Sequence, residues 1–256
     1  MPLNDPDRSV LPVLGVPIDV LTSQEAVQRI AVWAQRKESR CVCICNAHSV
    51  ITAQGDPDFM RTLCTADMAT PDGAPVAWML RRLGARRQAR VSGPDLMWDY
   101  CAHAADSGEG IFLYGSSAET LQELQLNLRA RWPSLRIVGA ISPPFRPLRP
   151  DEDEADVKII NASGAGTLWV SLGCPKQERW MAAHRGSVQA VMVGVGAAFD
   201  FHAGTVARAP GWMRANGLEW LHRLASEPRR LWRRYLVTNT MFILGAARQL
   251  LLARGR

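Results

Sequence analysis

The sequence predicts an α/β fold in which a mostly parallel sheet is flanked by helices. Short apolar runs alternate with helical patterns along the chain, and this alternation is typical of strand–helix–strand units. The 256 residues can enclose a full core, and 47% hydrophobic with 21% charged residues is the composition of a globular protein. Strand signals stop after Gly204, so we expect a core over residues 1–203 and a helical appendage over residues 204–256.

Each expected strand is a short apolar run that stops at a glycine, a proline or a polar residue. The expected strands are Arg40–Cys45, Met68–Thr70, Gly110–Tyr114, Leu135–Ala140, Thr167–Ser171 and Ala190–Val195. The expected helices are Ser23–Gln35 (capped by Ser23), one opened by Pro57, Asp72–Leu83, Pro94–Ala105, Ala118–Trp132, Asp151–Asn161 and Pro175–His184. The proline-rich segment Ser142–Pro150 is expected to be a loop, and two or three helices are expected after Gly204.

The positive charge of the chain is concentrated in the appendage. From Gly204 to Arg256 there are ten arginines and two acidic residues, a net charge of +8. Because the whole chain carries +6, the remaining residues sum to −2. The appendage is therefore expected to meet an anionic partner, whether a nucleotide, a lipid or a nucleic acid.

The cysteines and the N-terminal segment are typical of a cytoplasmic protein. Cys41, Cys43 and Cys45 alternate along one strand, where alternate residues do not readily bridge, so we expect buried free thiols. Residues 1–12 lack the pattern of a signal peptide. The apolar run Tyr235–Leu252 is interrupted by Thr238, Asn239, Arg248 and Gln249. It is expected to lie on a membrane surface rather than to span the bilayer.

Polar residues follow several predicted strands, at the sheet edge where α/β proteins bind ligands. Asp72 lies between Pro71 and Gly73, at a strand end and a helix start. It is either a helix N-cap or a general base held at the positive end of a helix. Asn46, after the strand Arg40–Cys45, either binds a sugar hydroxyl or closes a turn.

Three glycine-containing turns are further candidates for binding a ligand. Gly115, with two serines after it, could place a phosphate at a helix N-terminus, but the dinucleotide fingerprint G-x-G-x-x-G is absent. Gly194 and Gly196 flank a strand end, where glycine more often serves turn geometry. The most specific turn comprises Gly173, Cys174, Pro175, Lys176, Gln177 and Glu178. Lysine opposes the helix dipole at such a position, which favours a ligand-binding role over capping.

No metal site is expected. The three Asp-x-Asp strings begin at Asp5, Asp56 and Asp151; the first lies in the N-terminal segment, and the other two suit acidic first turns of helices. The five histidines show no ligand spacing. If a diphosphate leaves from this site and no metal ion binds it, arginines must offset its negative charge. The arginines that lie close together in the sequence are Arg214, Arg223, Arg229, Arg230, Arg233 and Arg234. The competing interpretation is that they form a solvated basic face.

Five sequence blocks, taken in order, resemble the WecG/TagA/CpsF glycosyltransferases (glycosyltransferase family 26). The blocks are PDGAPVAWMLRR (Pro71–Arg82), RVSGPDLM (Arg90–Met97), GCPKQERW (Gly173–Trp180), GVGAAFDFHAGTVARAP (Gly194–Pro210) and GLEWLHRLASEPRRLWRRY (Gly217–Tyr235). The resemblance runs from about Val16 to beyond Tyr235. It is specific for the family and much less specific for the sugar.

The resemblance implies a Rossmann-like core with a helical, membrane-binding C-terminal appendage, the arrangement called GT-E type. Family members are inverting, metal-independent enzymes that use no cofactor and move a sugar from a UDP-sugar to a polyprenyl-diphosphate-linked sugar. They work at the inner leaflet of the cytoplasmic membrane, in the synthesis of cell-surface polysaccharides. By position, Asp72 matches the catalytic base and Asn46 a neighbouring pocket residue, while Arg223, Arg230 and Arg214 match arginines that approach the diphosphate.

The resemblance leaves the substrates and the assembly open. Gly73 and Arg90, in the first two blocks, are expected to bind the donor with the glycine turns. Many members have threonine at the position of Ile44, so a contact made by that hydroxyl is lost or replaced here. Segment Ile44–Val50 resembles a xanthan-type glucosyltransferase branch, although relatives also use an N-acetylated mannosamine or a mannosaminuronic acid. A homo-oligomer is compatible with the sequence.

Two other functions account for part of the sequence. A nucleic-acid-binding protein could use the ten arginines of the appendage, but no nucleic-acid-binding motif is present and Asp72 would have no role. An oxidoreductase of the Rossmann type is disfavoured because the dinucleotide fingerprint is missing. Binding of UDP, but of neither NAD nor DNA, would separate the three hypotheses.

Overall fold

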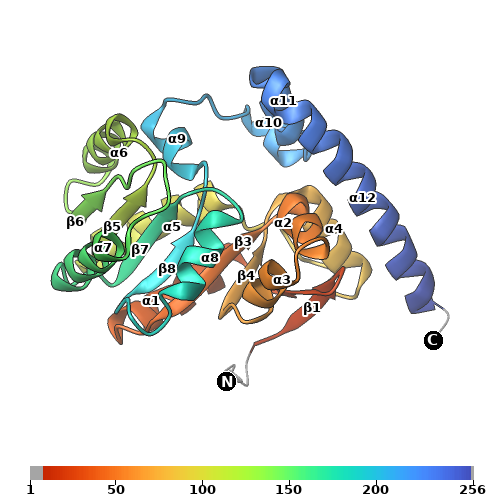
Figure 1. The fold of residues 1–256 in the computed structure, drawn as a ribbon. Coiled ribbons are helices and arrows are strands. Elements are labelled where there is room, and N and C mark those ends of the chain that lie inside the picture. The colour runs from red at the N-terminus through yellow and green to blue at the C-terminus, as the bar shows by residue number, and fades with distance from the viewer. Residues whose placement is uncertain (1–7, 255–256) are drawn as a thin grey trace.

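A six-stranded parallel sheet forms the centre of the molecule (Figure 1). The computed structural model describes residues 8–254, without the side chains of Arg230 and Arg254. The strands lie in the order β4-β3-β8-β7-β5-β6, and each neighbouring pair is parallel. Their bounds are β3 Arg40–Cys45, β4 Met68–Pro71, β5 Gly110–Gly115, β6 Arg136–Ile141, β7 Thr167–Ser171 and β8 Val191–Gly194. The α/β class and all six predicted strands are confirmed.

Helices cover both faces of this sheet. One face packs against α1 (Ser23–Gln35), α5 (Gly93–Ser107), α6 (Ala118–Arg131) and α9 (Ala198–Ala203). The other packs against α2 (Ala47–Gln54), α3 (Pro57–Cys64), α4 (Gly73–Arg82), α7 (Pro150–Ala162) and α8 (Lys176–Ala183). Parallel strands are apolar on both faces because helices cover each side, and β5 is buried throughout its length.

The helix starts follow from local capping, with one correction to the sequence prediction. Thr22, not Ser23, caps α1: its hydroxyl accepts from the backbone N–H of Glu25, whose carboxylate accepts in return from the Thr22 N–H. Asp56 caps α3 through the N–H of Phe59, and Asp151 lies in the first turn of α7. Asp5 lies outside the described residues. The predicted loop Ser142–Pro150 is free of regular structure up to α7.

Two strands and two helices were not predicted. The strands β1 (Val10–Val13) and β2 (Val16–Asp19) form an antiparallel hairpin next to β4. Asp19 fastens this hairpin, since its Oδ2 accepts from the Ala69 N–H at 2.7 Å and its carboxylate pairs with Arg29 at 3.3 Å. The helices α2 and α9 are short and begin directly after strand ends, so neither carries a long apolar periodicity.

The chain ends in three helices that fold back over the carboxyl edge of the sheet (Figure 1). These are α10 (Gly211–Ala215), α11 (Glu219–Ser226) and α12 (Pro228–Arg254), and we call residues 211–254 the C-terminal segment. The α12 helix runs beside α2 and reaches the hairpin, where Gln249 accepts from the Leu14 N–H at 2.8 Å and donates to the Pro12 carbonyl at 2.6 Å. The helices expected after Gly204 are thus present and docked, while the division of the chain between residues 203 and 204 stays a prediction.

One glycine sets how closely this segment approaches the core. Gly217, between α10 and α11, has φ +72°, and a Cβ on it would lie 2.7 Å from the Cβ of Ala74 in the first turn of α4. A side chain at this position would push α11 away from the sheet edge. The segment therefore meets the core next to the end of β4.

Candidate active site

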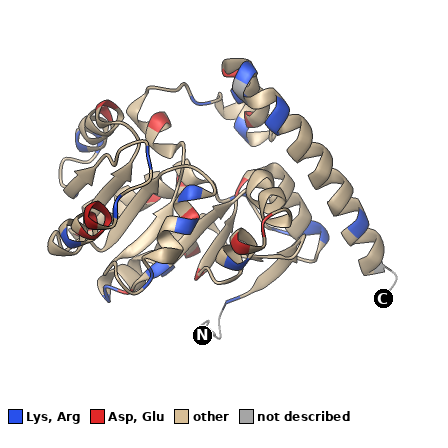
Figure 2. Cartoon of the chain, in the orientation of Figure 1, with Lys and Arg blue, Asp and Glu red and all other residues tan. Residues whose placement is uncertain are grey.

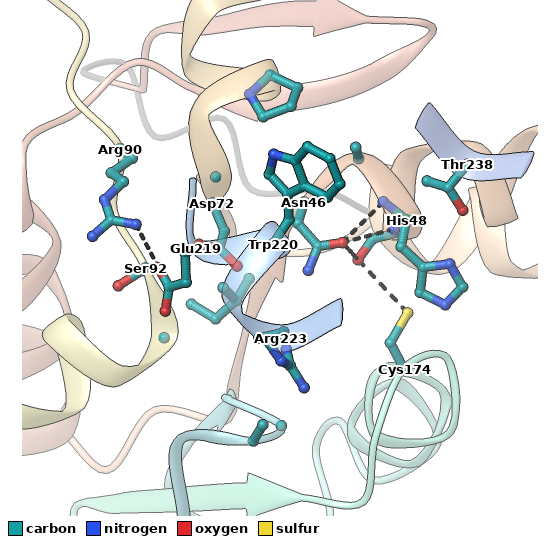
Figure 3. Close-up of a pocket in the computed structure, with 18 of the residues that line it drawn as sticks. Asn46, His48, Asp72, Arg90, Ser92, Cys174, Glu219, Trp220, Arg223 and Thr238 are labelled. Atoms are coloured by element: carbon teal, nitrogen blue, oxygen red, sulfur yellow. Dashed lines mark hydrogen bonds and ion pairs between the residues drawn. The ribbon is translucent and has the colours of Figure 1, made fainter. Parts of the chain in front are cut away.

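A pocket of about 480 Å³ lies where the C-terminal segment covers the carboxyl ends of the strands. The loops after β3, β4, β7 and β8 form its floor, and α11 and α12 close it. Figure 3 shows side chains from both parts of the chain converging on this space. The lining residues used below are Ile44, Asn46, His48, Asp72, Gly73, Arg90, Gly173, Cys174, Gln177, Glu178, Gly194, Gly196, Glu219, Trp220, Arg223, Arg234, Tyr235 and Thr238.

Asp72 lies in this pocket at the point where β4 passes into α4. Its backbone N–H donates to the Cys45 carbonyl at 3.0 Å, which ties it to the end of β3. It occupies the N-cap position of α4, yet its side chain makes no capping hydrogen bond. Asp72 therefore stands at a capping position, but its carboxylate does not cap the helix and lines the pocket instead.

The environment of Asp72 raises the pKa of its carboxyl to about 6. Burial is the largest cause, and the nearby Glu219 carboxylate adds to it. Arg90, the Asn46 side chain and the Gly73 N–H act in the opposite direction and lower the pKa. A carboxyl group with a pKa near 6 is ionised at neutral pH and still basic enough to accept a proton.

Asn46 performs the turn-closing role that the sequence left open. It is the N-cap of α2, and its Oδ1 accepts from the N–H groups of His48 at 3.0 Å and Ser49 at 3.1 Å. The side chain also hydrogen-bonds Asp72 and lowers the pKa of that carboxyl. Figure 3 shows Asn46 beside Asp72, so capping of α2 fixes the amide next to the carboxylate.

A network of charges connects the core to the C-terminal segment on one side of the pocket. Arg90 lies 2.7 Å from Glu219 on α11 and 3.7 Å from Asp95 on α5. Arg208 lies 2.7 Å from Asp95 and 3.8 Å from Glu219, and Arg214 lies 3.6 Å from Asp95. These pairs position Arg90 and Glu219 at the pocket wall.

The turn before α8 places two polar residues in the pocket wall. Gln177 accepts from the Gly196 N–H at 3.1 Å and donates to Glu178 at 3.0 Å, which links this turn to the glycine turn after β8. Burial raises the pKa of the Glu178 carboxyl to about 7. Gly173, Gln177, Glu178, Gly194 and Gly196 all line the pocket, and their donor-binding roles stay predictions.

Lys176 and Gly115, by contrast, lie outside the pocket lining. Lys176 is exposed on α8. A Cβ on Gly115 would lie 2.3 Å from the Ser171 carbonyl oxygen, so this glycine allows β5 and β7 to approach closely. Ser117 caps α6 through the Thr120 N–H. The contacts give the turn at Gly115 a structural explanation, while the donor roles of Gly115 and Lys176 remain predictions.

The arginines predicted at the diphosphate separate into two groups. Arg223 and Arg234 line the pocket, and the guanidinium of Arg223 lies 5.6 Å from the centre of the Phe201 ring. Arg214 lies outside the lining and holds the Ala209 carbonyl and Asp95 instead. The side chain of Arg230 is outside the described part of the structure.

Several pocket residues were not predicted from the sequence. His48 follows the Asn46 cap, and burial, together with Arg234, lowers the pKa of its imidazole to about 4, so it is neutral at pH 7. Trp220, Tyr235 and Thr238 come from α11 and α12. Asparagine before an apolar stretch is a helix-start signal that could have revealed α2. No local pattern indicates which face of α12 returns to the core.

The ionisable side chains of the pocket suit an anionic, hydroxyl-bearing ligand better than a metal ion. Among the described residues, no group of three histidine, cysteine or acidic side chains is placed to hold a metal. Arginine forks bind phosphate oxygens, and carboxylates accept protons from hydroxyl groups. Proton transfer beside a phosphate-bearing group is the chemistry that this arrangement can perform.

A family comparison identifies the class of enzyme. The model of the glycosyl transferase WecG/TagA/CpsF family matches residues 11–256, which takes in the sheet, the pocket and the C-terminal segment. This match favours neither an oxidoreductase nor a nucleic-acid-binding protein. The chain belongs to the WecG/TagA/CpsF family and is a glycosyltransferase of cell-surface polysaccharide synthesis.

Proposed function

We propose that the enzyme transfers a sugar from a UDP-sugar to a polyprenyl-diphosphate-linked sugar, with inversion and without a metal ion. The observation that carries this proposal is the Asp72 carboxyl, which lies in the pocket without a capping bond and has a pKa of about 6. Arg223 and Arg234 line the same pocket and would bind a diphosphate.

One base is enough for such a transfer. Asp72 accepts the proton of the acceptor hydroxyl while that oxygen forms a bond to the anomeric carbon of the donor. The bond from this carbon to the UDP oxygen breaks on the opposite side, which inverts the configuration. The diphosphate leaves with the electron pair, and its negative charge is stabilised by Arg223 and Arg234.

The C-terminal segment suits an anionic membrane as the place where the lipid-linked acceptor is met. Its exposed large apolar side chains are Trp212, Trp220, Leu221, Trp232, Leu236, Val237, Met241, Ile243, Leu244, Leu251 and Leu252. Figure 2 shows basic residues gathered on the same helices. Apolar side chains with neighbouring arginines favour the surface of a bilayer that contains anionic lipids. We place the enzyme on the cytoplasmic side, at the inner leaflet.

The contacts of α12 favour a helix that lies on the bilayer. Leu231–Ala253 is long and apolar enough to cross a membrane by length and composition alone. Its other face is occupied, however: Phe242 and Ala246 are buried in the core, and Gln249 is hydrogen-bonded to the hairpin. A helix that crossed the bilayer would have to give up these contacts.

Product analysis tests this proposal. The purified enzyme is incubated with a panel of UDP-sugars, including UDP-glucose, and with lipid-linked monosaccharide acceptors, and products are identified by mass spectrometry. We expect one donor to give a lipid-linked disaccharide of inverted configuration in the presence of EDTA. The xanthan-type branch predicts that UDP-glucose is this donor and glucosyl-diphosphate-lipid the acceptor. Retained configuration, or loss of transfer in EDTA, would refute the mechanism.

A further inference from the structure

A second carboxylate, that of Glu219, faces the pocket from the C-terminal segment. Glu219 is the first residue of α11, and its side chain is 20% exposed. Its Oε2 accepts from Arg90 at 2.7 Å, and its Oε1 lies 3.8 Å from Arg208. In Figure 3, Glu219 lies between Arg90 and Asp72. The proposed mechanism gives this acidic side chain no role.

The geometry of Arg90 shows what Glu219 does to its surroundings. Arg90 precedes α5 and is followed by Val91, whose N–H donates to the Pro71 carbonyl next to Asp72. The charge of Arg90 favours ionised Asp72. Its hydrogen bond nevertheless goes to Glu219. An arginine bonded directly to Asp72 would hold that carboxylate as a stable ion and make it a poor base.

We propose that Glu219 is a positioning residue that holds Arg90 away from Asp72 and so completes the general base only when the C-terminal segment is docked. The inference rests on the proposed function, because it needs Asp72 to act as a base. Docking is what brings Glu219 to this place, since α11 approaches the core through Gly217 against Ala74. The segment then supplies arginines that stabilise the leaving group. It also supplies Glu219, which keeps Arg90 from pairing with the base Asp72.

The other groups that face Asp72 do not replace this effect. Tyr235 on α12 and Cys45 on β3 also interact with the Asp72 charge. Burial raises the pKa values of both the Tyr235 hydroxyl and the Cys45 thiol, so both are neutral at pH 7. Among the charged side chains that shift the pKa of Asp72, Glu219 raises it and Arg90 lowers it, while burial makes the largest contribution. Arg223 and Arg234 line the same pocket and act on Tyr235.

This arrangement has a consequence for when the enzyme is active. If α11 leaves the core, Glu219 leaves with it, and Arg90 is released to pair with Asp72. The base is then weaker in the undocked enzyme, at the same time as Arg223 is withdrawn. An enzyme that is not bound to its acceptor would therefore hydrolyse less UDP-sugar.

The test is Glu219→Gln in the full-length enzyme, which removes the charge and keeps the shape. The pKa of Asp72 is followed by ¹³C NMR of labelled aspartate, with the signal assigned by Asp72→Asn. The acid limb of the pH profile of kcat/KM for transfer is followed in parallel. We expect both to move down by about one pH unit, and kcat at pH 7 to fall about 3- to 10-fold. Glu219→Asp should restore part of the shift.

Glu154→Gln is the matched control, because it makes the same change of charge at an exposed residue of α7, where Glu154 pairs with Lys158 outside the pocket lining. We expect it to leave the Asp72 titration in place. An unchanged titration in Glu219→Gln, or an equal shift in Glu154→Gln, would overturn the inference. The NMR titration needs no substrate. A chain that shows the shift but transfers no sugar would therefore count against the proposed function and not against the role of Glu219.

Discussion

The parallel-sheet core and the C-terminal segment are stabilised in different ways. In the core, whole strands such as β5 are buried, and helices close both faces of the sheet. In the segment, α10 and α11 have no buried residue, and α12 buries only a few side chains, among them Leu231 and Phe242. The segment is held mainly by the pairs of Arg214 with Asp95 and of Glu219 with Arg90, by the Gln249 bonds and by this narrow apolar contact.

This difference assigns different tasks to the two regions. Burial in a rigid core can shift the pKa of a carboxyl and hold it in place, which a general base needs. A lightly buried helical segment can move and can keep apolar surface for another partner. The core is therefore expected to carry the proton transfer, and the segment to carry the charge of the leaving group and the contact with the membrane. The following changes test this division.

The largest effect is expected from Asp72→Asn in the core. Asparagine has the same shape but accepts no proton, so kcat for transfer should fall at least about 1,000-fold. Asp72 makes no capping bond, so the circular dichroism spectrum and the thermal midpoint should stay close to those of the wild type. UDP binding, measured by calorimetry, should also persist. Transfer within tenfold of the wild-type rate would remove Asp72 from the role of base.

The next effect is expected from Arg223→Ala in the segment. Arg223 lines the pocket, and loss of a group that stabilises the leaving diphosphate should lower kcat/KM about 100-fold. Arg233→Ala is the matched control, because this arginine is exposed beside Trp232 and outside the pocket lining. With a short-chain acceptor in detergent, the control should stay within about twofold of the wild type. Equal losses in both variants would indicate a general effect of charge.

Prediction from the sequence was also unequal between the two regions. The core strands were found because each is an apolar run bounded by glycine, proline or polar residues, as in Thr167–Ser171. Asp72, Asn46 and Gln177 were found because ligand sites follow strand ends. The hairpin was missed because its strands have four residues each and contain Pro12 and Pro17, which weaken a strand signal.

The share of the pocket that belongs to the segment was only partly predictable. Arginine content indicated that the segment meets an anion, but it did not indicate which arginine faces the pocket. Arg223 does line it, whereas Arg214 is turned toward Asp95. Trp220 and Thr238 reach the site only because α11 and α12 fold back onto the sheet edge, a long-range contact that leaves no periodic pattern in the sequence.

A smaller effect is expected from Glu178→Gln, which tests burial in the core. Burial raises the pKa of Glu178 to about 7 in the folded protein, above its ordinary value of 4.5. The native state then binds this proton more tightly than the unfolded state does. Stability from this group is complete below pH 4.5 and is lost as the pH rises from about 4.5 to 7.

Glutamine cannot ionise, so the variant should escape this loss. Between pH 5 and pH 8, the free energy of unfolding should fall by about 1–2 kcal/mol more in the wild type than in Glu178→Gln. Urea titrations at the two pH values measure this difference. Asp151→Asn is a suitable control, because Asp151 is an exposed acid in the first turn of α7. If the free energy of unfolding changed equally with pH in the wild type and in Glu178→Gln, burial would not raise the pKa of Glu178.

The smallest effect is expected from Leu244→Glu, which tests the apolar surface of the segment. Leu244 is 66% exposed on α12, so a change there should leave folding intact. If this surface enters a bilayer, glutamate replaces a buried apolar side chain with an anion near anionic lipids. Binding to vesicles with phosphatidylglycerol should then weaken about tenfold, as measured by sedimentation. Leu126→Glu on α6 is the matched control, since Leu126 is 53% exposed on the core, and it should sediment like the wild type. Because both variants add the same charge to an exposed leucine, only a membrane contact confined to the segment separates them. Equal loss in both would assign vesicle binding to overall charge and return the C-terminal segment to a purely catalytic role.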